Sequence, residues 1–438
     1  MDSGIGIMGH SKQVGVYEHG LFSPSDIESS QKIEYRPMTS VTDDGPVEFN
    51  IPPTPGKIFD VHSMTLFGKM GIRKLKAGTT NEWEKLVVAD LNNVGVINNI
   101  YQSLWESVGI KVNDTEIENN NYHVGAYLQT LCGAQESAQK TIMERRLFIK
   151  DPYNKWDSLD AESANYKRGA NFKNEWTQFV VPLYNDLQTT VGNYLPPNTK
   201  MTVTLRRSSN DFCLMKQGTG TYKIVLDDLR LKMMVMTPSA AALNRFNTRY
   251  KTKGPKVTYT KNVLKTYTVP AGNFDLSCHN LFFGDRLPDQ VFVAMVDQEA
   301  FSGDTAQNPY QFKHFDLTTA SLVVNGVSEP SIPYSFDKTH DNISLYYELL
   351  ENTGTRPFEN ESINITPLEF RAGYFILAWD RNPVKNNRLG PTRMDGGYMS
   401  VRMKTKTALA DNITVLVFGS YINDMEFKND SVKIENHF

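Results

Sequence analysis

The sequence has only three cysteines in 438 residues, Cys132, Cys213 and Cys278. They lie far apart and are odd in number, so they fit neither a disulfide framework nor a zinc site. Free thiols of this kind are typical of proteins that are kept in a reducing compartment. We therefore expect unpaired cysteines in a protein that is assembled inside a cell.

Long apolar runs are missing as well. No stretch approaches the ~18 apolar residues that a membrane-spanning helix needs. The N-terminus does not have the basic and then apolar layout of a secretory signal. The net charge of −3 gives no electrostatic reason to expect specific nucleic-acid binding.

The eight histidines contain no pair that would place two ligands on one face of an element. Two histidines share one face of a strand at positions i and i+2 and one face of a helix at positions i and i+4, and neither spacing occurs in the sequence. A cupin-like oxygenase needs such a pair together with a carboxylate and a third histidine. We expect no metal site, and we expect His314 in Phe312–Phe315 to be a packed or surface side chain.

Motifs for catalysis are equally scarce. Asp227 with Asp228, and Asp285 with Asp289, are the carboxylate pairs that could suggest acid–base chemistry, but acidic residues beside turns are usually solvated. Gly4–Gly9 matches the spacing G-x-G-x-x-G, yet only three residues precede it, and a dinucleotide site needs a buried strand there. No nucleophile elbow or phosphate-binding loop is present. The sequence predicts no catalytic residue, no cofactor and no enzymatic activity.

The chain does contain the same series of elements twice. Leu104–Asp114 and Leu317–Gly326 are apolar runs that each end in a tight Asn turn, because Asn-Asp and Asn-Gly tolerate positive φ. A short helix is predicted after each turn, and alternating strands follow at Met201–Leu205 and Met399–Met403. The predicted buried faces of the two helices are Val124, Tyr127, Leu128 and Leu131 in the first half and Ile343, Tyr346, Tyr347 and Leu350 in the second.

These patterns predict an all-β fold of two tandem eight-stranded jelly-roll sandwiches, a double jelly roll, with short helices in its loops. Thr237 and Pro238 are expected to cap and begin a linker helix. The N-terminal arm is expected to lie outside the sandwiches and to serve assembly, with Val16, Tyr17, Leu21 and Phe22 as anchors. The predicted organisation is an N-terminal arm over 1–45, a first jelly roll over 46–236, a linker helix over 237–255, a second jelly roll over 256–428 and a fraying C-terminal tail over 429–438.

Two sequence blocks resemble a known family. Glu48–Val61 (EFNIPPTPGKIFDV) resembles the start of the first sandwich in double-jelly-roll major capsid proteins. Asn280–Gly303 (NLFFGDRLPDQVFVAMVDQEAFSG), Asn308–Phe315 (NPYQFKHF) and Val324–Gly326 resemble the opening of the second sandwich, in the same order. Within that family, the chain resembles the hexon-like proteins of adintoviruses, adomaviruses and Polinton-type elements. The resemblance extends from about Glu48 to Ile422.

The resemblance implies a structural major capsid protein that forms homotrimeric, pseudo-hexagonal capsomers in the icosahedral shell of a DNA virus or virus-derived element. Neighbouring capsomers, penton proteins and minor capsid proteins are the implied partners, the virion capsid is the implied location, and nothing is implied about an internal membrane. Two alternatives remain at this point. A two-module carbohydrate-binding jelly-roll protein would call for a secretory signal and disulfides, and a two-domain cupin-like enzyme would call for metal ligands.

Three long loops are the candidate surfaces for trimer assembly. The charged segment from Asp151 to Trp176 is predicted to be a surface excursion, with Trp156, Tyr166 and Phe172 as its aromatic contacts. The other two are Asn352–Pro367 and Arg381–Gly397. Loops at one end of the jelly rolls are expected to intertwine around a threefold axis, because exposed edges and apolar loops need a closed, symmetric partner.

Overall fold

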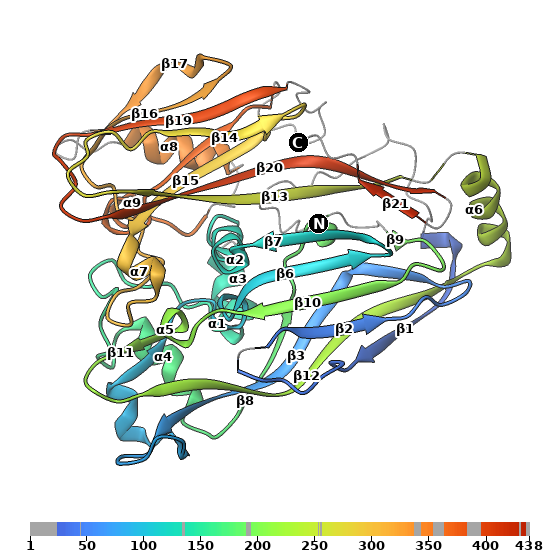
Figure 1. The fold of residues 1–438 in the computed structure, drawn as a ribbon, viewed down its shortest axis with the longest axis horizontal. Coiled ribbons are helices and arrows are strands. Elements are labelled where there is room, and N and C mark those ends of the chain that lie inside the picture. Colours follow the sequence, from blue (N-terminus) through green and yellow to red (C-terminus); the bar gives the residue numbers. More distant parts are fainter. Residues whose placement is uncertain are drawn as a thin grey trace.

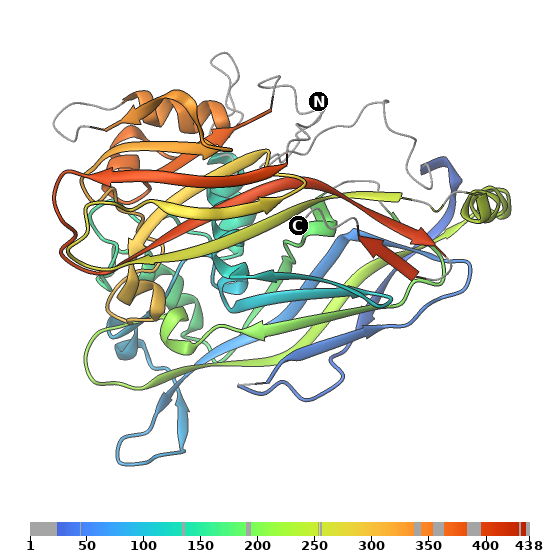
Figure 2. The same cartoon turned by 45° about the horizontal axis from the view of Figure 1, so that its top comes forward.

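The computed structural model describes residues 24–43, 45–133, 136–189, 194–252, 254, 256–336, 343–353, 363–382, 396–428 and 431–434. Within these ranges the chain is built mainly from antiparallel strands, arranged as two sandwiches (Figure 1). The first sandwich precedes the linker helix α6, Ala240–Thr252, and the second follows it. Figure 2 shows α6 projecting from one end of the molecule.

The second sandwich has the strand order of a jelly roll. One sheet runs β13-β20-β15-β18 and the other β14-β19-β16-β17. If the eight strands are lettered B to I along the chain, these sheets read B-I-D-G and C-H-E-F, the arrangement of two Greek keys wrapped face to face. The strands are β13 Lys256–Val269, β14 Cys278–Gly284, β15 Gln290–Asp297, β16 Leu317–Val324, β17 Val327–Ser335, β18 Ile376–Asp380, β19 Gly397–Thr405 and β20 Ile413–Lys428.

The first sandwich repeats that order strand for strand. Its sheets run β1-β12-β3-β8 and β2-β10-β6-β7, which again read B-I-D-G and C-H-E-F. The predicted double jelly roll is therefore confirmed. The strands are β1 Ile27–Tyr35, β2 Val47–Ile51, β3 Ile58–Leu75, β6 Trp105–Val112, β7 Thr115–Asn120, β8 Thr177–Pro182, β10 Met201–Arg207 and β12 Tyr222–Pro238.

Shorter elements complete the described chain. The additional strands are β4 Trp83–Lys85, β5 Val94–Val96, β9 Tyr194–Leu195, β11 Leu214–Lys216 and β21 Ser431–Ile434. The other helices are α1 Ile100–Ser103, α2 Tyr122–Leu131, α3 Glu136–Ala138, α4 Ala164–Gly169, α5 Asn210–Cys213, α7 Gln298–Ser302, α8 Ile343–Asn352 and α9 Pro367–Ala372. The single turns are η1 Pro24–Asp26, η2 Val88–Asn92, η3 Gln139–Met143, η4 Ala170–Phe172 and η5 Asp186–Thr189. None of the helices in the described residues has the length and the apolar character that crossing a membrane requires.

The turn and strand predictions hold in both halves. Asn113 and Asn325 have φ values of 51° and 50°, and each joins two paired strands. Buried and half-buried side chains alternate from Met201 to Leu205 of β10, as a strand with one core face requires. Residues Val291–Val296 of β15 are buried on both faces, as their continuous apolar run indicates.

The prediction that residues 1–45 lie outside the sandwiches is wrong for Ile27–Tyr35. This segment is β1, and it pairs antiparallel with β12 from Pro238 to Leu231. Most of its side chains are exposed, so the sequence has no apolar period there. Backbone hydrogen bonds hold the strand in place, and a hydrophobic pattern does not report them. Val16, Tyr17, Leu21 and Phe22 lie outside the described residues.

Two smaller corrections concern the linker and the tail. Thr237 and Pro238 still belong to β12, and the side chain of Ser239 caps α6 by accepting from the Ala242 amide at 3.2 Å. In the tail, Ser431–Ile434 does not fray but forms β21, which pairs with β20. In both places the backbone pairing of the strands extends further than the side-chain pattern of the sequence indicated.

The buried face of α2 is confirmed and that of α8 is not. Val124, Tyr127, Leu128 and Leu131 are all buried. In α8 the buried side chains are instead Leu345, Leu349 and Asn352, whose amide donates to the Ala378 carbonyl of β18 at 2.7 Å. Of the predicted face, Tyr346 and Leu350 are half-buried, while Ile343 and Tyr347 are exposed. The sequence offered two apolar stripes, and β18 takes the one through Leu349.

Truncation of Leu349 to alanine should lower the free energy of unfolding by about 2–5 kcal/mol, the range for a packed core leucine. Leu368→Ala, on the neighbouring helix α9 where the side chain is 53% exposed, should change it by less than about 0.5 kcal/mol. Leu350→Ala should fall between the two because that side chain is half-buried. Denaturant unfolding of the three variants measures these differences. Equal losses at Leu349 and Leu368 would contradict the observed packing of α8.

Candidate assembly interface

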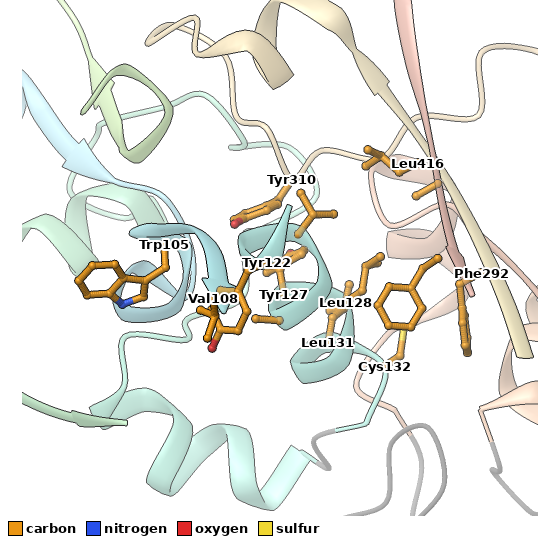
Figure 3. Packing of buried hydrophobic residues seen from close by; sticks show 14 of the residues in the cluster. Trp105, Val108, Tyr122, Tyr127, Leu128, Leu131, Cys132, Phe292, Tyr310 and Leu416 are labelled. Atoms are coloured by element: carbon orange, nitrogen blue, oxygen red, sulfur yellow. The ribbon is translucent and has the colours of Figure 1, made fainter. Parts of the chain in front are cut away.

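The two sandwiches meet in an interface built around α2, which we call the inter-sandwich interface. Leu128, Leu131 and Cys132 lie on the side of α2 that faces Phe292 of β15 and Leu416 of β20 (Figure 3). Gly125 brings the helix close to this sheet, since a Cβ there would lie 3.4 Å from the Phe418 ring. The outer face of the second sandwich is thus covered by a helix of the first.

Aromatic rings extend this contact beyond α2. The rings of Tyr127 and Tyr310 stack with centroids 3.9 Å apart, and the Tyr310 hydroxyl lies 2.6 Å from that of Ser103. Tyr310 and Phe312 come from the loop between β15 and β16, inside the Asn308–Phe315 motif. Burial raises the pKa of Tyr310 far above its usual range and lowers the pKa of His123 to about 4. These groups therefore stay uncharged at neutral pH and serve packing.

The segment from Asp151 to Trp176 is not a surface excursion. Trp156, Arg168 and Phe172 are buried, and Tyr166 is half-buried. The Trp156 indole donates to the Ala372 carbonyl at 3.2 Å, which places it against the second sandwich. Because Trp156 and Phe172 are enclosed within one chain, they are not available as contacts between chains.

Arg168 is the centre of a polar cluster inside this segment. It donates to Asp151 at 2.7 Å and to the Val96 carbonyl at 2.9 Å, and it also bonds Asn165 and the Ile149 carbonyl. Both charged side chains are fully enclosed, with 0% exposure. Burial raises the pKa of Asp151, and the Arg168 guanidinium opposes that shift. The Tyr374 hydroxyl, from the second half, donates to the Asp151 carbonyl at 2.9 Å.

Sequence reasoning missed these residues for a physical reason. Arg168 and Asp151 stand in a charged, aliphatic-poor stretch, which is the pattern of a solvated loop. The available signal was the Asn308–Phe315 motif, because Asn308 donates two hydrogen bonds to this segment. Its side-chain amide nitrogen donates to the Trp156 carbonyl at 3.3 Å, and its backbone N–H donates to the Asp157 carboxylate at 2.7 Å. The motif that carried the resemblance therefore fixes the inter-sandwich interface.

A second buried carboxylate, Asp186 of η5, lies where the first sandwich meets β13. It accepts from the Asn262 backbone at 3.1 Å and from the Asn262 side chain at 3.0 Å. Burial raises the pKa of Asp186 to about 7, and the two Asn262 hydrogen bonds and the nearby Lys261 offset this only in part. Burial also lowers the pKa of Lys261 itself.

The raised pKa of Asp186 predicts a pH dependence of stability. Between pH 4 and 7 the unfolded chain loses this proton while the folded chain keeps it, so the free energy of unfolding falls as pH rises. The fall from this group should amount to roughly 4 kcal/mol, at about 1.4 kcal/mol per pKa unit. Asp186→Asn should remove it, and Asp227→Asn, at an exposed carboxyl, should not. Unfolding measured across this pH range would disprove the assignment if both variants behaved alike.

The carboxylates and the histidine that were weighed as possible site residues lie in ion pairs, in aromatic packing or at the surface. Asp228 is paired with Arg230 at 2.8 Å, Asp227 is exposed, and Asp289 lies 4.0 Å from Arg286. His314 accepts from the Asp316 amide at 3.0 Å and packs against Phe336. Gly4–Gly9 lies outside the described residues. Among the residues that are described, no three His, Cys, Asp or Glu side chains are grouped so as to hold a metal ion.

Cys132, Cys213 and Cys278 are free and buried, as predicted, and burial raises the pKa of each thiol to about 12. Most of the Asn352–Pro367 and Arg381–Gly397 loops lies outside the described residues.

Comparison with solved structures identifies the architecture. A chain of the Sputnik virophage superposes with a TM-score of 0.62 at 12% identity, covering 98% of this chain and 91% of that one. The faustovirus major capsid protein superposes with a TM-score of 0.55 at 10% identity, covering 94% of this chain and 92% of that one. The mavirus major capsid protein gives 0.50 at 10% identity, covering 98% and 93%. This chain has the double-jelly-roll fold of viral major capsid proteins.

Comparisons of sequence cover much less of the chain than the comparison of structures does. No family model matches the chain. An uncharacterized protein of Caenorhabditis elegans is 28% identical over 149 residues, which are 33% of this chain. The matched region is about a third of that relative's length, 35%. The fold therefore rests on the three-dimensional comparison.

Proposed function

We propose that this chain is the structural major capsid protein of an icosahedral DNA-virus shell, and that it acts as a homotrimeric, pseudo-hexagonal capsomer. The observation that carries the proposal is the fused pair of jelly rolls with identical strand order, joined by a buried interface. Three chains with two similar sandwiches each would present six similar sides to their neighbours. A closed symmetric ring is also the usual solution for a contact that repeats head to tail.

The finer assignment is part of the same proposal. The Asn280–Gly303 and Asn308–Phe315 blocks favour the adintovirus, adomavirus and Polinton-type lineage, as an exogenous virus or as a virus-derived element. Penton and minor capsid proteins would be its further partners, and the buried free thiols fit assembly in a reducing compartment of the host cell. The role is structural, with no catalytic step assigned to any residue.

Electron microscopy of the purified chain tests the proposed function. We expect uniform triangular or pseudo-hexagonal particles in negative stain, and shell fragments or closed shells at high protein concentration. Single two-lobed particles at every concentration would argue against a capsomer. A screen of such monomers against a glycan array would then test the carbohydrate-binding alternative directly.

A further inference from the structure

Helix α8 exposes apolar side chains where its counterpart in the first half is covered. Both helices connect the F and G strands of their sandwich: α2 lies between β7 and β8, and α8 between β17 and β18. Every side chain of α2 except Gln129 is buried. In α8, Ile343 and Tyr347 are one turn apart and 63% and 47% exposed. The two helices differ because α2 has the second sandwich of its own chain as a neighbour.

The surface that receives α2 also has a counterpart. In the second sandwich, Phe292 of strand D pairs with Phe418 of strand I and with Ala378 of strand G, and all three are buried. In the first sandwich, Phe67 of strand D pairs with Arg230 of strand I and Val180 of strand G. Val180 is 52% exposed, and Phe67 and Arg230 are half-buried. This row, the Phe67 row, has the same place in the fold, but no helix among the described residues covers it.

The edge strands of the two sandwiches show the same difference between a contact made within the chain and a surface left open. Within the chain, β7 (strand F of the first sandwich) lies beside β13 (strand B of the second) and β21, and Thr115 donates to the Val432 carbonyl at 2.5 Å. Among the described residues, β17 pairs with β16 alone and β1 with β12 alone. Val327 and Ile332 of β17 are 66% and 80% exposed. Figures 1 and 2 both show β17 and β1 at opposite ends of the molecule.

We propose that the second sandwich of one copy docks on the first sandwich of the next copy, with β17 beside β1 and α8 over the Phe67 row. This contact continues the inter-sandwich interface from one chain to the next, using the corresponding elements at each side. Such a contact is heterologous, and it closes into a ring if the rotation between successive sandwiches is about 60°. The inference rests on the proposed capsomer and names the surfaces that would build it.

The chemistry of the two surfaces is compatible with this contact. The Phe67 ring lies under two cations, with the Lys232 ammonium 4.7 Å and the Arg230 guanidinium 5.5 Å from its centre. Glu34 and Asp228 partly neutralise them. The described residues of α8 include two carboxylates, Glu348 and Glu351, and no lysine or arginine. The helix would thus bring apolar side chains to the ring and carboxylates to the cations around it.

Cross-linking between introduced cysteines tests the contact. The variant with Tyr347→Cys and Val180→Cys is treated with a short bis-maleimide at micromolar concentration and separated under denaturing conditions. The natural thiols are buried, so they should react little. We expect covalent species of two and three chains from the double variant, and almost none from either single variant. A protein that sediments as a trimer but gives no such species would overturn this inference and leave the proposed function intact. A monomer would overturn both.

Charge substitution on α8 gives an independent test. Ile343→Asp with Tyr347→Asp should shift the trimer–monomer midpoint at least tenfold toward higher protein concentration. Ile343→Leu with Tyr347→Phe should leave it within about twofold of the unmodified chain. Circular dichroism checks the fold of both variants, and we expect both to be folded because these side chains are exposed on the single chain. Unchanged trimerisation of the aspartate variant would show that α8 faces solvent in the assembly.

Discussion

Arg168→Met should lower the free energy of unfolding by about 3–5 kcal/mol, which is a large share of the stability of a typical domain. The guanidinium is fully enclosed and binds Asp151, Asn165 and two backbone carbonyls. Its removal would leave the Asp151 carboxyl buried without its cation, and the carbonyls of Val96 and Ile149 without their donor. The loss should appear in chemical denaturation of the full chain.

Two further variants test whether the expected loss at Arg168 comes from burial of its ion pair or would follow from removing an ion pair at the surface as well. Lys140→Met removes an ion pair with Glu136 at 2.6 Å whose side chains are 71% and 59% exposed, so it should change the free energy of unfolding only slightly. Combining Arg168→Met with Asp151→Leu should recover part of the loss, because both buried charges leave together. A cost at Arg168 no larger than at Lys140 would show that the cluster is solvated in the folded chain.

Leu128→Ala should cost about 2–5 kcal/mol and should loosen the contact between the sandwiches. Leu128 is 1% exposed on the side of α2 that faces Phe292 and Leu416 (Figure 3). The substitution leaves a cavity in the inter-sandwich interface. Because the side chains around it are closely packed, the cavity would close only if one sandwich moved toward the other. We expect a lower unfolding midpoint together with faster proteolysis of the segments that join the two halves.

Leu368→Ala is the matched control, since this leucine is 53% exposed on α9. It should change stability by no more than about 0.5 kcal/mol and leave proteolysis unchanged. If Leu128→Ala resembled this control, α2 would not be the element that holds the two sandwiches together.

The sequence predicts those parts of the fold that have a repeating side-chain pattern. Strands such as β10 and β15, and the Asn113 and Asn325 turns, follow from alternation and from residues that tolerate positive φ. Strand β1 did not follow, because its side chains are exposed and its stability comes from its ladder with β12. The matching strand order of the second sandwich could have indicated it, since a jelly roll needs a strand B.

The packing of α8 and the burial of Arg168 were harder to predict for a different reason. Whether α8 buries the stripe through Leu349 or the one through Ile343 depends on where β18 lies, and the helix sequence contains both. The sequence pattern indicated surface charges at Arg168 and Asp151. The two residues are 17 positions apart in the sequence, and Arg168 also binds the Val96 carbonyl of β5, 72 positions away. Long-range contacts of this kind leave no local period in the sequence.

Sedimentation of the purified full-length chain tests the central claim most directly. At micromolar concentration we expect a single species of three times the 49.6 kDa of one chain, and an unfolding midpoint that rises with protein concentration, as for an obligate oligomer. A well-folded species of one chain mass, with a midpoint independent of concentration, would contradict the capsomer.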